Sequence, residues 1–117
     1  MALTYADETD LRSRLRAMLD AAERKRRERL AIIVESTSER RDVGDVFEGV
    51  QRETDLTVSA ATADEASVTI RRVMQALARM GAGTYGVCVD CGNDIAVSRL
   101  FALPFASRCI ACQEALE

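Results

Sequence analysis

The sequence predicts a mainly α fold: a long antiparallel coiled-coil hairpin, then a small four-cysteine module and a short C-terminal helix. Residues 7–39 and 46–80 repeat apolar side chains with a helical period and contain no proline. Aromatic residues make up only 4% of the chain and charged residues 30%, which favours exposed helices over a large globular core. All four cysteines lie in two CxxC pairs near the C-terminus. We therefore expect a hairpin over residues 1–82 and a cysteine module over residues 83–117.

The first long helix is expected to run from Asp7 to Glu39. Acidic residues in its first turn complement the positive end of the helix dipole. Its apolar residues follow the 4-3-4 spacing of a coiled-coil seam; they are Leu11, Leu15, Met18 and Ala22. A basic run at residues 24–29 interrupts this seam, and Leu30 and Ile33 resume it.

A turn is expected near residues 38–47, where Gly44 supplies backbone freedom and Asp45 is placed to cap the next helix. The second helix then runs from about Val46 to Met80, and its last seam consists of Ile70, Val73, Leu77 and Met80. At the α-helical rise the two arms would be about 50 and 52 Å long, so they match as partners in a hairpin. Small residues in the middle of the second arm predict close but weak packing; they are Ala60, Ala61, Ala63 and Ala66.

A rival start for the second helix is Thr62. Thr62-Ala-Asp-Glu65 has the pattern of a capping box, and residues 57–62 have low helix propensity. A helix that began there would leave half of the first arm without a partner. We therefore favour the longer helix, with a weak stretch at residues 57–62.

The C-terminal module begins after Gly81 and Gly83, which end the second helix. A brief strand or turn is expected at Ile95–Leu100. A final helix is expected at Ser107–Leu116, with two of the cysteines one turn apart on one face.

Cys88-Val-Asp-Cys91 and Cys109-Ile-Ala-Cys112, separated by seventeen residues, form the strongest chemical pattern in the chain. Two thiolates from each of two turns can surround one metal ion as a tetrahedron, which is typical of structural zinc sites. The chain has no histidine, so the site must be all-cysteine. We expect one structural zinc ion in a zinc-finger module. Because protein ligands fill all four positions, no catalytic water can bind, which argues against an enzyme.

Two disulfides, or two redox-active CxxC motifs, are the alternatives to zinc. Disulfides suit an oxidising compartment, but the N-terminal residues offer no apolar targeting run. Redox CxxC motifs are typical of a thioredoxin-like βαβ context, which this helical pattern does not provide. No apolar run approaches the length of a membrane span, so we expect a cytoplasmic protein that does not contact membranes.

Charge is unevenly placed along the chain, although the net charge is only −3. Residues 11–29 hold eight Arg or Lys against three acids, and residues 35–65 hold nine acids against three Arg. This asymmetry indicates a protein partner more than general nucleic-acid binding, which usually needs a clear basic excess. The structural alternative is two solvated helix faces of opposite sign that help the arms to pair.

The tail carries more of a pattern than its four cysteines. It reads Gly83-Thr-Tyr-Gly-Val-Cys-Val-Asp-Cys-Gly92, then Ile95, Arg99-Leu100, Ala102, Pro104, Ala106 and Cys109-Ile-Ala-Cys112-Gln. This closely resembles the bacterial DksA/TraR family of four-cysteine zinc-finger proteins. The resemblance implies a monomeric transcription regulator of the stringent-response type, which binds RNA polymerase without direct sequence-specific DNA binding.

The resemblance also implies how such a regulator acts. The coiled coil enters the secondary channel of the polymerase, and tip acids in an Asp-x-x-Asp-x-Ala pattern reach toward the catalytic centre. Asp42 and Asp45 match both acids, with Phe47 in place of the alanine. An alignment that counts back from the cysteines without gaps places Asp45, Glu48 and Val50 at the three positions of this pattern instead. Matched arms favour the Asp42 register; the structural alternative is that both acids only form a turn and a cap.

Many members of the family act together with ppGpp, which basic residues bind. Two of the implied basic positions hold Leu103 and Gln113 here, whereas Arg72 and Arg99 match two others. We therefore expect weak or no ppGpp binding.

The polymerase contacts expected from the basic residues are Arg24, Lys25, Arg26, Arg27, Arg72 and Arg99. Two other functions stay open. A nucleic-acid-binding zinc ribbon would show steeply salt-dependent binding through residues 24–29. A thiol-based redox sensor would lose zinc on mild oxidation.

Overall fold

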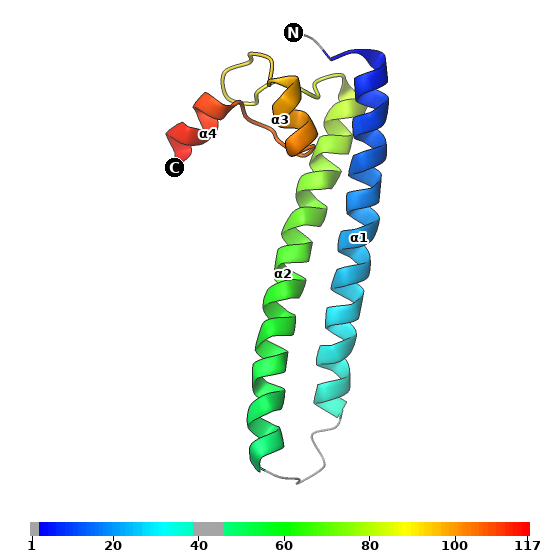
Figure 1. The fold of residues 1–117 in the computed structure, drawn as a ribbon, viewed down its shortest axis with the longest axis vertical. Coiled ribbons are helices and arrows are strands. Elements are labelled where there is room, and N and C mark those ends of the chain that lie inside the picture. The colour runs from blue at the N-terminus through cyan, green and yellow to red at the C-terminus, as the bar shows by residue number, and fades with distance from the viewer. Residues whose placement is uncertain (1–2, 39–45) are drawn as a thin grey trace. The chain divides into compact units, whose positions relative to one another are not determined.

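A computed structural model describes the backbone of residues 3–38 and 46–117, and the side chains of residues 3–35 and 57–117. The described residues form four helices, α1 (Tyr5–Ser38), α2 (Val46–Ala82), α3 (Val97–Ala102) and α4 (Ile110–Leu116) (Figure 1). None of these helices, as far as they are described, combines the length and the apolar character needed to cross a membrane. The predicted fold class, two long helices followed by a four-cysteine module, is confirmed.

The chain divides into two compact units. One consists of the chain up to Leu19 together with Arg71–Glu117, and the other consists of Asp20–Ile70. Both long helices therefore contribute to both units. In the first unit, the beginning of α1 packs against the end of α2, so the two helices are antiparallel there.

Helix α1 begins two residues before its predicted start because Thr4 and Asp7 form a reciprocal cap. The Thr4 hydroxyl oxygen accepts a hydrogen bond from the Asp7 backbone N–H at 3.1 Å, and the Asp7 carboxylate accepts one from the Thr4 N–H at 3.4 Å. These two bonds satisfy donors that a helix N-terminus otherwise leaves unpaired. The predicted end at Glu39 lies outside the described residues.

Helix α2 is continuous through residues 57–62, so the prediction of a long second helix is confirmed and the rival start at Thr62 is wrong. The Thr62 hydroxyl donates to the carbonyl of Val58 at 2.9 Å, a bond within the helix rather than a cap. Ser67 and Thr69 make the same kind of bond one turn back. Such bonds occupy the polar side chains without competing for the helical backbone N–H groups.

The end of α2 is a Schellman motif. Thr84 N–H donates to the carbonyl of Arg79 at 2.9 Å, and Gly83 N–H donates to that of Met80 at 3.3 Å. Gly83 has a φ of 76°, in the left-handed region that this motif requires and that glycine adopts without strain. The predicted glycine stop is therefore confirmed.

The core of the first unit joins both long helices to the cysteine module. Leu11 and Leu15 of α1 are fully buried, as the predicted seam requires. On α2 the fully buried residues are Val73 and Ala76, whereas Leu77, which the predicted seam included, is only partly buried. The same cluster includes five buried residues of the module: Tyr85, Cys88, Ile95, Leu100 and Ala106.

The second unit has a core of small residues. Ala22 of α1 is buried, as are three residues of α2, namely Ser59, Ala63 and Ala66. Ala60 and Ala61, also predicted to line this region, are exposed. A hydrogen bond crosses between the helices here, from Arg26 Nε to Ser67 Oγ at 3.0 Å. Because small side chains bury little apolar area, this packing is close but contributes little stability.

The cysteine module differs from its prediction in two places. Helix α3 replaces the strand or turn expected at Ile95–Leu100; within the described chain, strand pairing is limited to one bridge, between Val87 and Asp94. Helix α4 begins at Ile110 rather than Ser107, because the backbone of Cys109 is extended (φ −68°, ψ 166°). The extended segment leaves the Ser107 carbonyl free to accept a bond from Val89 N–H at 2.9 Å.

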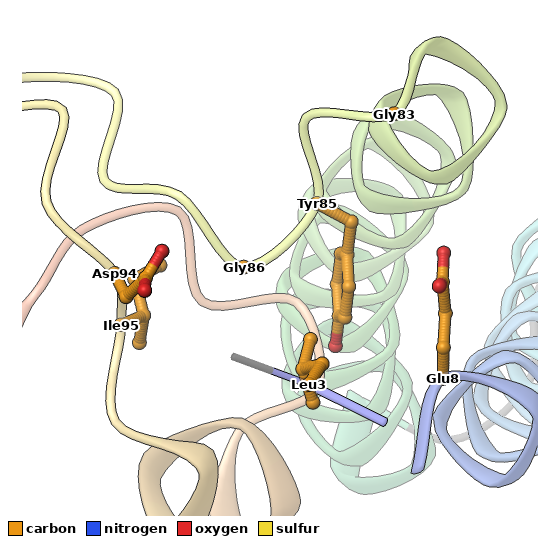
Figure 2. A pocket seen from close by; sticks show the side chains of 7 residues that line it. All are labelled: Leu3, Glu8, Gly83, Tyr85, Gly86, Asp94 and Ile95. Atoms are coloured by element: carbon orange, nitrogen blue, oxygen red, sulfur yellow. The ribbon is translucent and has the colours of Figure 1, made fainter. Parts of the chain in front are cut away.

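Contacts around Tyr85 attach the module to the start of α1. The buried Tyr85 hydroxyl donates to the carbonyl of Pro104 at 2.8 Å. Leu3 packs against Gly86, where a Cβ would lie only 2.8 Å from Leu3 Cδ1 and where φ is +84°. Figure 2 shows Leu3 between the Tyr85 ring and Ile95, beside a cavity of about 230 Å³. The positive φ favours glycine at position 86, and a larger residue there would also displace the end of the Leu3 side chain.

Replacing Tyr85 by Phe should lower the free energy of unfolding by about 1 kcal/mol at neutral pH, because the Pro104 carbonyl loses its buried partner. Burial raises the pKa of Tyr85 to about 12 from 10, with the Arg79 charge opposing and the Glu8 charge adding to this shift. Since the folded-state pKa is raised, this stabilisation is complete below about pH 10 and is lost as the pH rises to about 12.

Urea denaturation followed by circular dichroism at pH 8 and at several values from pH 10 to 12 tests this. The Tyr85→Phe variant should be less stable at pH 8 and should lose less stability at alkaline pH. Tyr5→Phe is the matched control, because the Tyr5 side chain is 86% exposed. Equal stability of the two variants at pH 8 would contradict the assignment.

Candidate metal centre

The four cysteine sulfurs form a cluster of the size of a tetrahedral zinc site. All four lie within 4.8 Å of one another, and Cys91 Sγ is 3.8 Å from Cys109 Sγ. Four sulfurs at about 2.3 Å from one zinc ion would lie about 3.8 Å apart, so the ion fits. A disulfide needs an S–S distance of about 2.05 Å, and all four cysteines are free thiols. The cluster therefore favours one structural zinc over two disulfides.

A tight turn positions the first cysteine pair. Gly92 N–H donates to the Cys88 carbonyl at 3.0 Å, and Cys88 N–H donates to the Asn93 carbonyl at 2.8 Å. Gly92 has a φ of 76°, so the turn needs a residue that tolerates the left-handed region. Cys88 is buried and belongs to the core cluster, whereas Cys91 is exposed.

The second pair sits at the start of α4. Cys109 is the N-cap residue, and its carbonyl accepts a hydrogen bond from Gln113 N–H at 2.9 Å. Cys112 follows in the first turn, and both residues are half-buried. This arrangement brings the predicted pair to one side of the helix start.

Hydrogen bonds and crowding separate the pKa values of the thiols. Backbone N–H groups of Cys91, then of Cys109 and Asp90, lower the pKa of Cys88 to about 6. Contacts with the Cys109, Cys88 and Cys91 sulfurs raise the pKa of Cys112 to about 12. Four thiolates so close together require a cation. Zinc binding must therefore release protons, and zinc affinity must fall in acid.

Those of the other predicted site residues that the structure describes are not part of the metal cluster. Asp42 and Asp45 lie outside the described residues. Arg24, Lys25, Arg26 and Arg27 are exposed on the part of α1 in the second unit. Two further predicted contacts already have partners in the first unit: the Arg72 guanidinium lies 5.8 Å from the centre of the Phe105 ring, and Arg99 Nε donates to the Arg108 carbonyl at 3.1 Å.

One pocket of the first unit gathers the four positions considered above for ppGpp, together with two arginines that the sequence did not single out, Arg79 and Arg108. Its volume is about 520 Å³, and its lining includes Arg72, Arg79, Arg99 and Arg108 together with Leu103 and Gln113. Arg79 Nη2 is buried and has no hydrogen-bond partner among the described residues. Burial lowers the pKa of Arg79, against the effect of Tyr85. The seven-residue spacing of Arg72 and Arg79, two helical turns, was the available signal for part of this pocket.

Replacing one ligand by Cys112→Ser should abolish stable zinc binding. The loss should exceed about 100-fold in affinity, because outer-shell groups alone change zinc affinity by about 10- to 100-fold. Most helical signal should persist, since α1 and α2 contain 34 and 37 residues. Zinc per chain is measured by elemental analysis after dialysis against a chelator, with circular dichroism in parallel. Ser98→Ala, at an exposed position of α3, is the control, and full zinc retention by Cys112→Ser would contradict the assignment.

Comparison with known proteins agrees with this geometry. Residues 83–117 match the model of the prokaryotic dksA/traR C4-type zinc finger. An RNA polymerase-binding transcription factor DksA of Caulobacter vibrioides is 32% identical over 91 residues, which is 78% of this chain and 62% of that protein. An uncharacterized protein of Aquifex aeolicus is 41% identical over 49 residues, 42% of this chain and 34% of that protein. The chain thus spans less than two thirds of the length of these relatives.

A solved structure shares the fold. Transcription factor DksA2 from Pseudomonas aeruginosa superposes with a TM-score of 0.59 and 24% sequence identity, over 89% of this chain and 83% of that chain. The finger match, the similarity that extends beyond it and the shared fold agree. Residues 83–117 match a C4 zinc finger of the dksA/traR type, whose four cysteines hold one structural zinc ion, and the chain is similar to DksA over 91 residues.

Proposed function

We propose that this protein is a cytoplasmic regulator that binds RNA polymerase and modulates initiation through the secondary channel. One observation carries the proposal: the similarity to the Caulobacter polymerase-binding factor extends over 91 residues. The finger spans only residues 83–117, so this similarity includes much of the two long helices. A regulator rather than an enzyme also suits a metal cluster in which four thiolates leave no open position.

In this proposal the zinc finger is structural and the acids of the segment between α1 and α2 are the effector residues. Asp42 and Asp45 would approach the polymerase centre, where magnesium and basic groups bind phosphates. Carboxylates placed there can perturb those contacts without doing chemistry. The alternative register assigns the same role to Asp45 and Glu48.

The basic run of α1 is the proposed contact with the channel rim. Three of its residues, Arg24, Lys25 and Arg27, are exposed. Arg26 is exposed too, but its Nε donates a hydrogen bond to Ser67 Oγ on α2. Arg72 and Arg99 are weaker candidates for direct contact, because Phe105 and the Arg108 carbonyl already engage them.

Neutralising both tip acids should abolish regulation while polymerase binding is kept. Asp42→Asn with Asp45→Asn should return transcription from a ribosomal-type promoter to the level without the protein, since the carboxylates carry the effect. The assay compares multiple-round transcription with pull-down on core polymerase. Single variants Asp42→Asn and Glu48→Gln separate the two registers, and Asp20→Asn, an exposed acid elsewhere on α1, is the control.

Two results would contradict the proposal in different ways. If the double variant regulates transcription as strongly as the native protein, Asp42 and Asp45 are not the effector residues. If the native protein does not bind RNA polymerase, the proposed function is wrong. Binding to promoter DNA alone, with a steep salt dependence through residues 24–29, would favour the nucleic-acid-binding zinc ribbon. Zinc loss and changed regulation at mild peroxide doses would favour the redox sensor.

A phosphorylated effector such as ppGpp is a second candidate, favoured by the arginine pocket. Leu103 and Gln113 argue against strong binding, but four arginines line the same pocket. One nitrogen of the Arg79 guanidinium has no hydrogen-bond partner within the described part of the chain. Arg79→Gln should weaken ppGpp binding to the polymerase–protein complex about tenfold, the loss of one charge-assisted hydrogen bond. Arg12→Gln on α1 is the control. Unchanged affinity in the variant, or no ppGpp effect with the native protein, would contradict this role.

A further inference from the structure

Two contacts join the two cysteine pairs of the zinc site without passing through the metal, and a third joins the second pair to α3. Val89 N–H donates to the Ser107 carbonyl at 2.9 Å. Arg108 Nε donates to Asp90 Oδ2 at 2.6 Å, and Arg99 Nε of α3 donates to the Arg108 carbonyl at 3.1 Å. The side chain and the carbonyl of Arg108 thus connect the first cysteine turn, the second pair and α3.

The positions of these residues matter for zinc release. Asp90 lies between Cys88 and Cys91, and Arg108 directly precedes Cys109. A cysteine pair cannot swing away from its partner pair unless the Asp90–Arg108 bond breaks. The movement is most easily started at Cys91, the one cysteine of the four that is exposed.

The charges around the site also indicate that the Asp90–Arg108 pair holds the two cysteine pairs together. Four thiolates around one Zn²⁺ leave a net charge of about −2. The Asp90 carboxylate adds a further negative charge to the first turn, and Arg108 neutralises it at 2.6 Å. The two side chains are 44% and 34% exposed, so solvent screens the pair and its effect must be moderate.

We propose that Asp90 and Arg108 form a clamp that slows the release of zinc. Arg108 is a positioning residue: its side chain bonds to Asp90 and thereby holds the Cys88–Cys91 turn against the segment that leads into Cys109. The clamp acts on the rate of zinc loss and leaves the four ligands and their geometry unchanged.

The test follows zinc release from the full-length, zinc-loaded protein into excess EDTA, with a chromogenic zinc indicator in stopped samples. Asp90→Asn and Arg108→Gln should each release zinc about two- to fivefold faster, the effect expected from a partly exposed ion pair. The conservative variant Arg108→Lys and the exchanged pair Asp90→Arg with Arg108→Asp should restore much of the native rate. In 1 M NaCl the difference should shrink, because salt screens the pair.

Two controls separate the clamp from a general loss of structure. Glu114→Gln changes an exposed acid on α4, two residues beyond Cys112, and should release zinc at the native rate. The absorption bands of the cobalt-substituted proteins should be the same in all variants, since tetrahedral thiolate coordination is kept. Native release rates for both Asp90→Asn and Arg108→Gln would overturn the proposal. Equal acceleration by Glu114→Gln, or failure of the exchanged pair to slow release, would also overturn it.

Discussion

A single buried cluster holds together segments that lie far apart in the sequence. Leu11 and Leu15 come from α1, Val73 and Met80 from α2, and Leu100 from the zinc-finger module. Truncating any one fully buried leucine of such a cluster costs about 2–5 kcal/mol, a large share of the stability of a small domain. Cys88 belongs to the same cluster, so packing against the long helices helps to position the metal site, just as the metal helps to stabilise the module. Zinc and apolar burial therefore stabilise one shared unit.

Periodicity and spacing predicted most of this arrangement. Heptad spacing placed Leu11 and Leu15 in the core, and the two CxxC pairs predicted a cluster whose sulfurs now lie within 4.8 Å of one another. The long second helix was preferred over a start at Thr62 because the arms had to match, and Thr62 indeed donates within a continuous helix. These features follow from local pattern and from the geometry of thiolate ligands, both of which a sequence displays directly.

Other features depend on contacts that no local pattern encodes. Helix α3 forms where a strand or turn was expected, because Leu100 is buried against the long helices. Asp90 and Arg108 are eighteen positions apart and meet only once the two cysteine pairs have come together. The arginine pocket collects side chains from α2, from α3 and from the segments that precede and follow Cys109. Tertiary structure alone brings such groups together.

We propose that the segment between α1 and α2 acts inside RNA polymerase and that zinc stabilises the folded unit to which both long helices contribute. Site-specific photo-cross-linking tests this most directly, with a photoreactive residue at Val43 and purified core polymerase, in native and zinc-depleted protein. The account predicts cross-links to the walls of the secondary channel near the catalytic centre, which weaken when zinc is removed. Cross-links only to the outer surface of the polymerase, or none with the zinc-loaded protein, would contradict it.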